Sequence, residues 1–154
     1  MGILMKNLIL VCLIISSSYS QNYTFLLNKY DKELELESKI ISKIMNSAVS
    51  KQPVLYIPEI KESEQYIYSK ILTLGKNCDE SNFIFIKRET ETCTCEGKHK
   101  VYFTNNYKKL LSDEKFFGAF FWSKSRPNIV FIKNRLEENN IILPDSYLQF
   151  VEDM

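Results

Sequence analysis

The chain has 154 residues, of which 45% are hydrophobic and 25% charged, with only four glycines and four prolines. This composition excludes collagen-like, low-complexity and wholly disordered classes, and the length fits one compact domain. The 20 basic and 19 acidic side chains nearly cancel. The chain therefore lacks the positive charge that binding to nucleic-acid phosphates draws on, and we expect no nucleic-acid partner.

The first twenty residues have the pattern of a secretory signal peptide. Lys6 precedes an uninterrupted apolar run over residues 8–15, and small residues follow. That order predicts cleavage before Gln21, and the run is too short for a membrane span, which needs about 20 residues. We therefore expect residues 1–20 to be a signal peptide and residues 21–154 to form one periplasmic or otherwise exported domain. An uncleaved anchor is the alternative.

The first half of the mature chain predicts two helices around a short strand. Asp31 is a good N-cap for the first helix, whereas the role of residues 21–30 stays open. Prolines bracket the strand, and Gly75 follows the second helix, where a left-handed cap is expected. The expected elements are a helix over 32–49, a strand over 53–58 and a helix over 62–74.

The second half alternates β-rich runs with short helical segments. The first expected elements are strands over 83–86 and 101–103 and a helix from Asn105 or Asn106 to Leu111. A hairpin of 116–122 and 128–132 follows, with a five-residue loop at 123–127. The last elements are a helix near 134–139 and a terminal helix from Pro144 or Asp145, with Tyr147, Leu148 and Val151 facing inward. Strands that alternate with helices predict an α/β fold. We expect a single layered domain with a mainly parallel sheet flanked by helices, to which the C-terminal β-hairpin adds an antiparallel edge.

Three cysteines remain after removal of the leader, namely Cys78, Cys93 and Cys95. An odd number in an oxidising compartment leaves one thiol unpaired. Because a bridge between Cys93 and Cys95 would form a strained ring, we predict one disulfide from Cys78 to either of them. Cys93, Cys95 and His99 could instead form a soft-metal or thiol-redox site, which is the alternative from another functional class.

No enzymatic site is recognisable in the sequence. His99 is the only histidine, and no Gly-x-Ser-x-Gly elbow accompanies it. Neighbouring carboxylates lie on segments predicted as exposed helix, where they are ordinarily solvated; these are Glu62 with Glu64, Glu137 with Glu138, and Glu152 with Asp153. A dinucleotide-binding glycine pattern, a P-loop and a calcium loop are all missing. We therefore expect no catalytic residues and no cofactor.

The segment from Phe116 to Trp122 contains five aromatic residues among seven. Core packing is one use for them, since both faces of a strand can be covered in an α/β sandwich. A partner surface is the other use, because Trp and Arg often dominate interface energies. We predict that Trp122, Lys124 and Arg126 form a partner-binding surface.

Five segments follow one another in a characteristic order from Cys78 onward. They are Cys78 before Phe83-Ile84-Phe85-Ile86, then Val101-Tyr102-Phe103-Thr104, Phe117-Gly118-Ala119-Phe120-Phe121, Ile129-Val130-Phe131-Ile132-Lys133-Asn134, and Ile142-Leu143-Pro144 before Tyr147-Leu148. This order resembles the YfiR-type family of small periplasmic proteins that restrain a membrane diguanylate cyclase. The resemblance implies an α/β regulatory or binding module without enzymatic activity that contacts the outer domain of a membrane protein. It leaves open whether the chain forms a homodimer.

Overall fold

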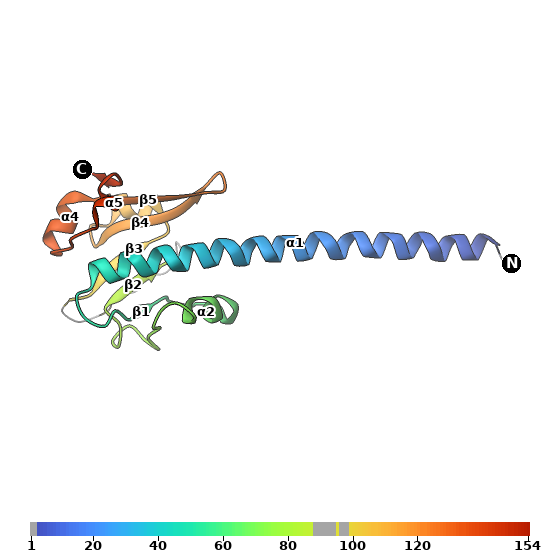
Figure 1. The fold of residues 1–154 in the computed structure, drawn as a ribbon, viewed down its shortest axis with the longest axis horizontal. Helices are drawn as coiled ribbons and strands as arrows, with labels where there is room; N and C mark the ends of the chain where they lie inside the picture. The colour runs from blue at the N-terminus through green and yellow to red at the C-terminus, as the bar shows by residue number, and fades with distance from the viewer. Residues whose placement is uncertain (1–2, 88–94, 96–98) are drawn as a thin grey trace. The chain divides into compact units, whose positions relative to one another are not determined.

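The computed structural model describes residues 3–87, 95 and 99–154, and it describes side chains from residue 26 onward. The chain divides into two compact units, residues 1–36 and residues 37–154. Within the first unit, the described residues belong to one helix, α1 (Ile3–Ala48), which continues into the second unit (Figure 1). The prediction that a helix begins only after Asp31 is therefore wrong. The reason is that α1 contains neither glycine nor proline to interrupt its hydrogen bonding.

The described residues of the second unit form a six-stranded sheet with the strand order β1-β2-β3-β4-β5-β6. The strands are β1 (Leu55–Tyr56), β2 (Phe83–Ile86), β3 (Val101–Thr104), β4 (Phe116–Ser123), β5 (Arg126–Ile132) and β6 (Val151–Glu152). All neighbouring pairs are parallel except the antiparallel β4–β5 hairpin. The predicted α/β fold, with a mainly parallel sheet and a C-terminal hairpin, is confirmed.

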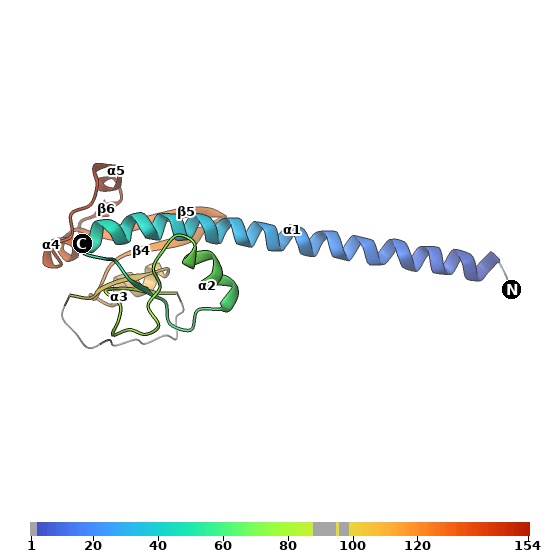
Figure 2. The same cartoon turned by 60° about the horizontal axis from the view of Figure 1, so that its bottom comes forward.

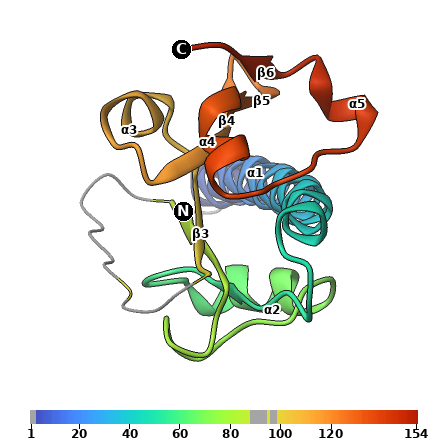
Figure 3. The ribbon, with the colours of Figure 1, turned by 90° about the vertical axis from the view of Figure 1, so that its left-hand side faces the viewer.

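Helices lie on both sides of this sheet. They are the C-terminal turns of α1, then α2 (Glu62–Ser69), α3 (Tyr107–Ser112), α4 (Lys133–Glu138) and α5 (Asp145–Leu148). Figure 3 shows α3 on one side of the sheet and the C-terminal turns of α1 on the other. Figure 2 shows α2 beside α1, where the Tyr68 hydroxyl donates a hydrogen bond to Glu37. As predicted, Asn106 caps α3, since its Oδ1 accepts a bond from the Lys109 N–H at 3.1 Å.

Two apolar layers, one on each side of the sheet, form the core. The first, which we name the phenylalanine face, has ring centroids 5.2–6.2 Å apart and consists of Phe83, Phe85, Phe103, Phe117 and Phe131. The second, which we name the disulfide face, consists of Ile84, Ile86, Leu110, Phe116, Ala119 and Ile132, with Cys78, Cys95, Tyr102, Phe121 and Val130 packed against them. The residues of β2 alternate between the two faces, as the pleat of a strand requires.

A β-bulge in β4 fits this strand to the phenylalanine face. Tyr102 pairs with Phe116 and Phe103 pairs with Gly118, so Phe117 is an extra residue in β4. A Cβ atom at Gly118 would lie 2.7 Å from Phe103 Cε2 and 2.8 Å from Phe131 Cδ1. Position 118 therefore needs glycine because the neighbouring rings approach its backbone closely.

The segment after α2 departs from the predicted helix over 62–74. The helix ends at Ser69, and the chain then runs beside β1, where the Leu55 N–H donates to the Thr73 carbonyl at 2.9 Å. The Gly75 N–H donates to the Leu55 carbonyl at 2.8 Å, so Gly75 continues this pairing and does not cap the helix. The helical spacing is overridden because the open edge of β1 offers hydrogen bonds to the chain.

The C-terminal segment also departs from its prediction. The helix that should have continued to Val151 ends at Leu148, and Val151 lies in β6, paired with Phe131 of β5. Tyr147 faces inward as predicted, with its ring 5.9 Å from that of Phe131, but Leu148 is 56% exposed. The free edge of β5 is again the cause, since the Phe131 N–H donates to the Phe150 carbonyl at 2.9 Å.

Candidate functional site

The β4–β5 hairpin extends beyond the sheet that holds its base. Among the described strands, β3 pairs with β4 no further than Ala119, and β6 pairs with β5 only at Phe131 and Ile132. Within the described part of the chain, residues 120–123 and 126–129 consequently pair only with each other. We name residues 120–129 the distal ribbon, which is visible at the end of the hairpin in Figure 1.

The turn of the distal ribbon is tighter than predicted. Ser123 pairs with Arg126, so the connection is Lys124-Ser125 and the expected five-residue loop over 123–127 is wrong. Lys124 has φ 50° and Ser125 has φ 59°. Positive φ at both central residues is the type I′ geometry, whose twist matches that of the flanking strands. Residue spacing alone did not reveal this turn because neither residue is the Asn or Gly that usually occupies it.

The predicted site residues Trp122, Lys124 and Arg126 all lie at this end of the hairpin. Trp122 is half-buried, and its ring lies 5.7 Å from that of Phe120 in an edge-to-face arrangement. Lys124 and Arg126 are exposed and have no ion-pair partner in the part of the chain that the structure describes. Because Trp and Arg are enriched at contact surfaces, the tip is chemically suited to bind a partner.

Trp122 and Arg126 lie on opposite faces of the ribbon. Trp122 pairs with Pro127, and Ser123 pairs with Arg126. Directly paired residues share a face and successive residues alternate, so Trp122 is on the side of the phenylalanine face and Arg126 on the side of the disulfide face. The structure thus brings the predicted residues to one tip, but not onto one flat surface.

The aromatic run of β4 divides along the strand. Phe116, Phe117 and Phe120 are completely buried. Phe121 is half-buried, with its ring 5.5 Å from that of Tyr107. Core packing therefore accounts for the start of the run, and only the end of the run is accessible to a partner.

A disulfide joins Cys78 to Cys95, whose Cα atoms are 5.7 Å apart. It selects one of the two predicted pairings; Cys93 lies outside the described residues. Tyr102 holds the Cys95 backbone, since the Cys95 N–H donates to the Tyr102 hydroxyl at 3.2 Å. Lys100 Nζ donates to the Cys78 carbonyl. These contacts make the bridge part of the packed disulfide face, where it links Cys95 to the loop before β2.

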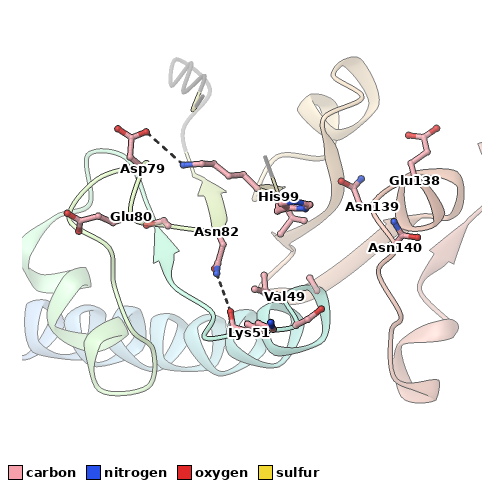
Figure 4. A pocket seen from close by; sticks show the side chains of 14 residues that line it. Val49, Lys51, Asp79, Glu80, Asn82, His99, Glu138, Asn139 and Asn140 are labelled. Carbon is pink, nitrogen blue, oxygen red and sulfur yellow. Dashed lines mark hydrogen bonds and ion pairs between the residues drawn. The ribbon is translucent and has the colours of Figure 1, made fainter. Parts of the chain in front are cut away.

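A polar hollow of about 880 Å³ borders the amino ends of β2 and β3. Figure 4 shows His99 between the Asp79–Asn82 segment and the end of α4. Its ionisable lining residues have both signs of charge, namely Lys51, Asp79, Glu80, His99, Lys100 and Glu138. Lys100 Nζ lies 3.9 Å from Asp79 Oδ1, and Asn82 Nδ2 donates to the Lys51 carbonyl at 3.4 Å. Because the charges are mixed, the hollow has no clear preference for an anion or a cation.

The structure gives no support to the alternative soft-metal site of Cys93, Cys95 and His99. The described residues contain no group of three or more His, Cys, Asp or Glu side chains placed to hold a metal ion. Cys95 is in the disulfide, so its sulfur is not the thiolate that a soft metal would require. Since Cys93 lies outside the described residues, this metal site stays a prediction.

A buried charged cluster was missed by the sequence reasoning. Lys87, the residue directly after β2, has its Nζ 2.9 Å from Glu37 Oε1 and 3.5 Å from Glu64 Oε1. Tyr68 donates to Glu37, and its ring lies 5.4 Å from Lys87 Nζ. Glu64 is only 8% exposed, so the expectation that it is solvated is wrong. The cluster joins α1, α2 and β2, and its one sequence signal is a charge at the carboxyl end of a buried strand.

Among the helices that the structure describes, none combines the length and apolar character required to cross a membrane. Comparisons with protein families, curated proteins and solved structures gave no match to the chain.

Proposed function

We propose that this chain is an exported regulatory or binding module without enzymatic activity, which acts by direct contact with the outer domain of a membrane protein. The distal ribbon is the contact surface. The proposal rests on how the distal ribbon is built. The ribbon extends past both neighbouring strands, and its tip carries two exposed cations and a half-buried tryptophan. Trp and Arg are the residues that most often anchor interfaces.

In its more specific form, the proposal names a membrane diguanylate cyclase as the partner. It rests on the order of segments from Cys78 onward, which resembles the YfiR-type regulators. Support also comes from the regular succession of parallel strands and helices that leads into the β4–β5 hairpin, because the same segments supply its strands. On this proposal the module restrains the cyclase by occupying its outer domain.

Export is supported by the disulfide, because such bonds persist in oxidising compartments and are rare in the cytosol. N-terminal sequencing of the exported protein tests it, with Gln21 expected as the first residue or one within two positions of it. A cytoplasmic product that retains Met1 would contradict both the compartment and the argument from cysteines.

The contact surface is tested by capture from detergent-solubilised membranes, with the mature protein immobilised. We expect Trp122→Ala and Arg126→Ala to reduce the amount of captured membrane protein. Tyr66→Ala and Lys108→Ala are matched controls, since Tyr66 is 65% exposed on α2 and Lys108 is exposed on α3. Equal capture by the ribbon variants and their controls would disprove the assignment of the surface.

A thiol-redox function is the second candidate, favoured by a disulfide in a chain with an odd number of cysteines after the leader. Mass mapping with and without reductant distinguishes the two candidates. A regulatory module should give a uniform Cys78–Cys95 bridge and one thiol. A mixture of pairings that shifts with the redox buffer would favour the second candidate.

A further inference from the structure

The segment between Glu114 and Glu137 carries charges of one sign only. It contains five basic and no acidic residues, namely Lys115, Lys124, Arg126, Lys133 and Arg135. The rest of the chain holds the other 15 basic residues and all 19 acidic residues. The near-zero overall charge therefore conceals a positive hairpin on a chain that is otherwise negative.

Three of these five cations have partners in the fold. Lys115 Nζ lies 3.2 Å from Asp113 Oδ2, and Lys133 Nζ lies 3.1 Å from Asp153 Oδ1. Arg135 is 6% exposed and donates from Nη1 to three backbone carbonyls. These three contribute to the base of the hairpin and are not available as specific contacts for a partner.

The remaining two cations, Lys124 and Arg126, are those at the tip. Both are exposed, and neither has an ion-pair partner within the described residues. Unpaired cations at the end of a projecting element attract negative charge over roughly a Debye length, about 8 Å at physiological ionic strength. Charge complementarity therefore indicates that the surface opposite the tip is acidic.

The two faces of the ribbon set the shape of that surface. Trp122 and Pro127 form a pair on one face, and Ser123 and Arg126 form the next pair on the other face. A flat surface can cover only one face of a two-stranded ribbon. A partner that contacts both Trp122 and Arg126 must therefore surround the tip.

We infer that the partner receives the distal ribbon in a cleft, and that the wall of this cleft opposite Arg126 carries carboxylates. This inference rests on the proposed function and adds the chemistry of the partner. A guanidinium can bind a carboxylate through two parallel hydrogen bonds, which fixes the orientation of the ribbon in the cleft. The apolar wall then packs against Trp122. An anionic lipid surface is the other source of negative charge, but it offers no second wall.

Site-specific photocrosslinking in the cells that make the protein tests this inference. A benzophenone amino acid is placed at Ser123, on the Arg126 side, or at Pro127, on the Trp122 side, in the full chain. Both positions are exposed, and unchanged thermal unfolding of each purified variant verifies its fold. The adducts are digested, and the attached peptide is sequenced by mass spectrometry.

We expect both positions to label the same membrane protein, and the Ser123 adduct to lie in a peptide with more Asp and Glu than Lys and Arg. Arg126→Glu should lower the yield of the Ser123 adduct roughly tenfold, because like charges then face each other. Lys108→Glu is the matched reversal on α3 and should leave the yield unchanged.

The other outcomes of the crosslinking contradict either the acidic cleft or the proposed function. A neutral or basic peptide at Ser123, a lipid adduct, or labelling from one face only would overturn the acidic cleft and leave the ribbon as the contact surface. Protein adducts at neither position would overturn the proposed function itself.

Discussion

The two halves of β4 have the same kind of sequence but different surroundings. From Phe116 to Ala119 the strand lies between β3 and β5, and its side chains are fully buried. From Phe120 to Ser123 its one partner among the described strands is β5, and the side chains change from fully buried at Phe120 to exposed at Ser123. Aromatic side chains thus stabilise the sheet in the first half, and those beyond Phe120 become accessible to a partner. Position in the sheet, and not residue type, separates the two roles.

The largest effect is expected at the buried half. Phe117→Ala should lower the free energy of unfolding by about 3–5 kcal/mol, as for other buried Phe truncations. Phe117 is the extra residue of the bulge, and its ring lies 5.2 Å from Phe103 and 6.2 Å from Phe131. Urea unfolding followed by circular dichroism measures the loss. A loss below 1 kcal/mol would mean that the phenylalanine face is not the core of this unit.

The next effect concerns the charged cluster of Lys87, Glu37 and Glu64 in the second unit. Lys87→Met should cost about 3 kcal/mol, because it leaves the buried Glu37 without its cation. The double variant Glu37→Gln with Lys87→Met should recover part of this loss, since the buried side chain at position 37 is then neutral, although Glu64 still loses its contact with Lys87. Urea unfolding of the single and double variants measures both quantities. Additive losses in the double variant would show that the two side chains are not coupled.

Local patterns predicted much of this fold because several elements carry their own signals. The apolar strands predicted over 83–86 and 101–103, the Asn106 cap and the hairpin all follow from neighbouring residues, and the structure confirms them. Residues 73–75 and 150–152 could not be predicted in this way. Their structure depends on free strand edges supplied by distant parts of the chain.

The candidate site was predicted by residue type but not by geometry. Trp122, Lys124 and Arg126 lie together at one tip, yet their division between two faces depends on the two-residue turn. The burial of Glu64 was not predictable, because Lys87 lies 23 residues further along the chain and meets it only in the folded protein. Charge patterning reports on exposed helices and does not reveal such long-range pairs.

The disulfide offers a way to separate stability from binding. Replacing both Cys78 and Cys95 by Ala should lower the free energy of unfolding by about 2–3 kcal/mol, in line with a bridge that spans 17 residues. Capture of the membrane protein should persist at concentrations and temperatures where the variant is folded, because the bridge lies on the body of the unit and not at the tip. Unfolding curves and capture are measured on the same preparation. Loss of capture by a folded variant would instead favour the thiol-redox function.

Trp122→Ala is expected to have a smaller effect on stability than Phe117→Ala in the same strand, about 1 kcal/mol, because Trp122 is only half-buried. Its effect on capture should be much larger than that of Tyr66→Ala. Since Trp122 is the only tryptophan, its fluorescence in the unmodified protein reports on the tip alone. A destabilisation as large as that of Phe117→Ala would assign the whole aromatic run to the core.

Arg126→Ala should have the smallest effect on stability and still reduce capture. The side chain is exposed on the turn side of β5 and has no ion-pair partner among the described residues, so unfolding should change by no more than about 0.5 kcal/mol. Capture should fall, and it should become less sensitive to salt, because one of the two unpaired cations at the tip is removed. Titrating sodium chloride during capture, with Lys108→Ala as the control, measures this difference. If wild type and Arg126→Ala lose capture equally with salt, the guanidinium makes no electrostatic contact, and the distal ribbon binds through Trp122 alone.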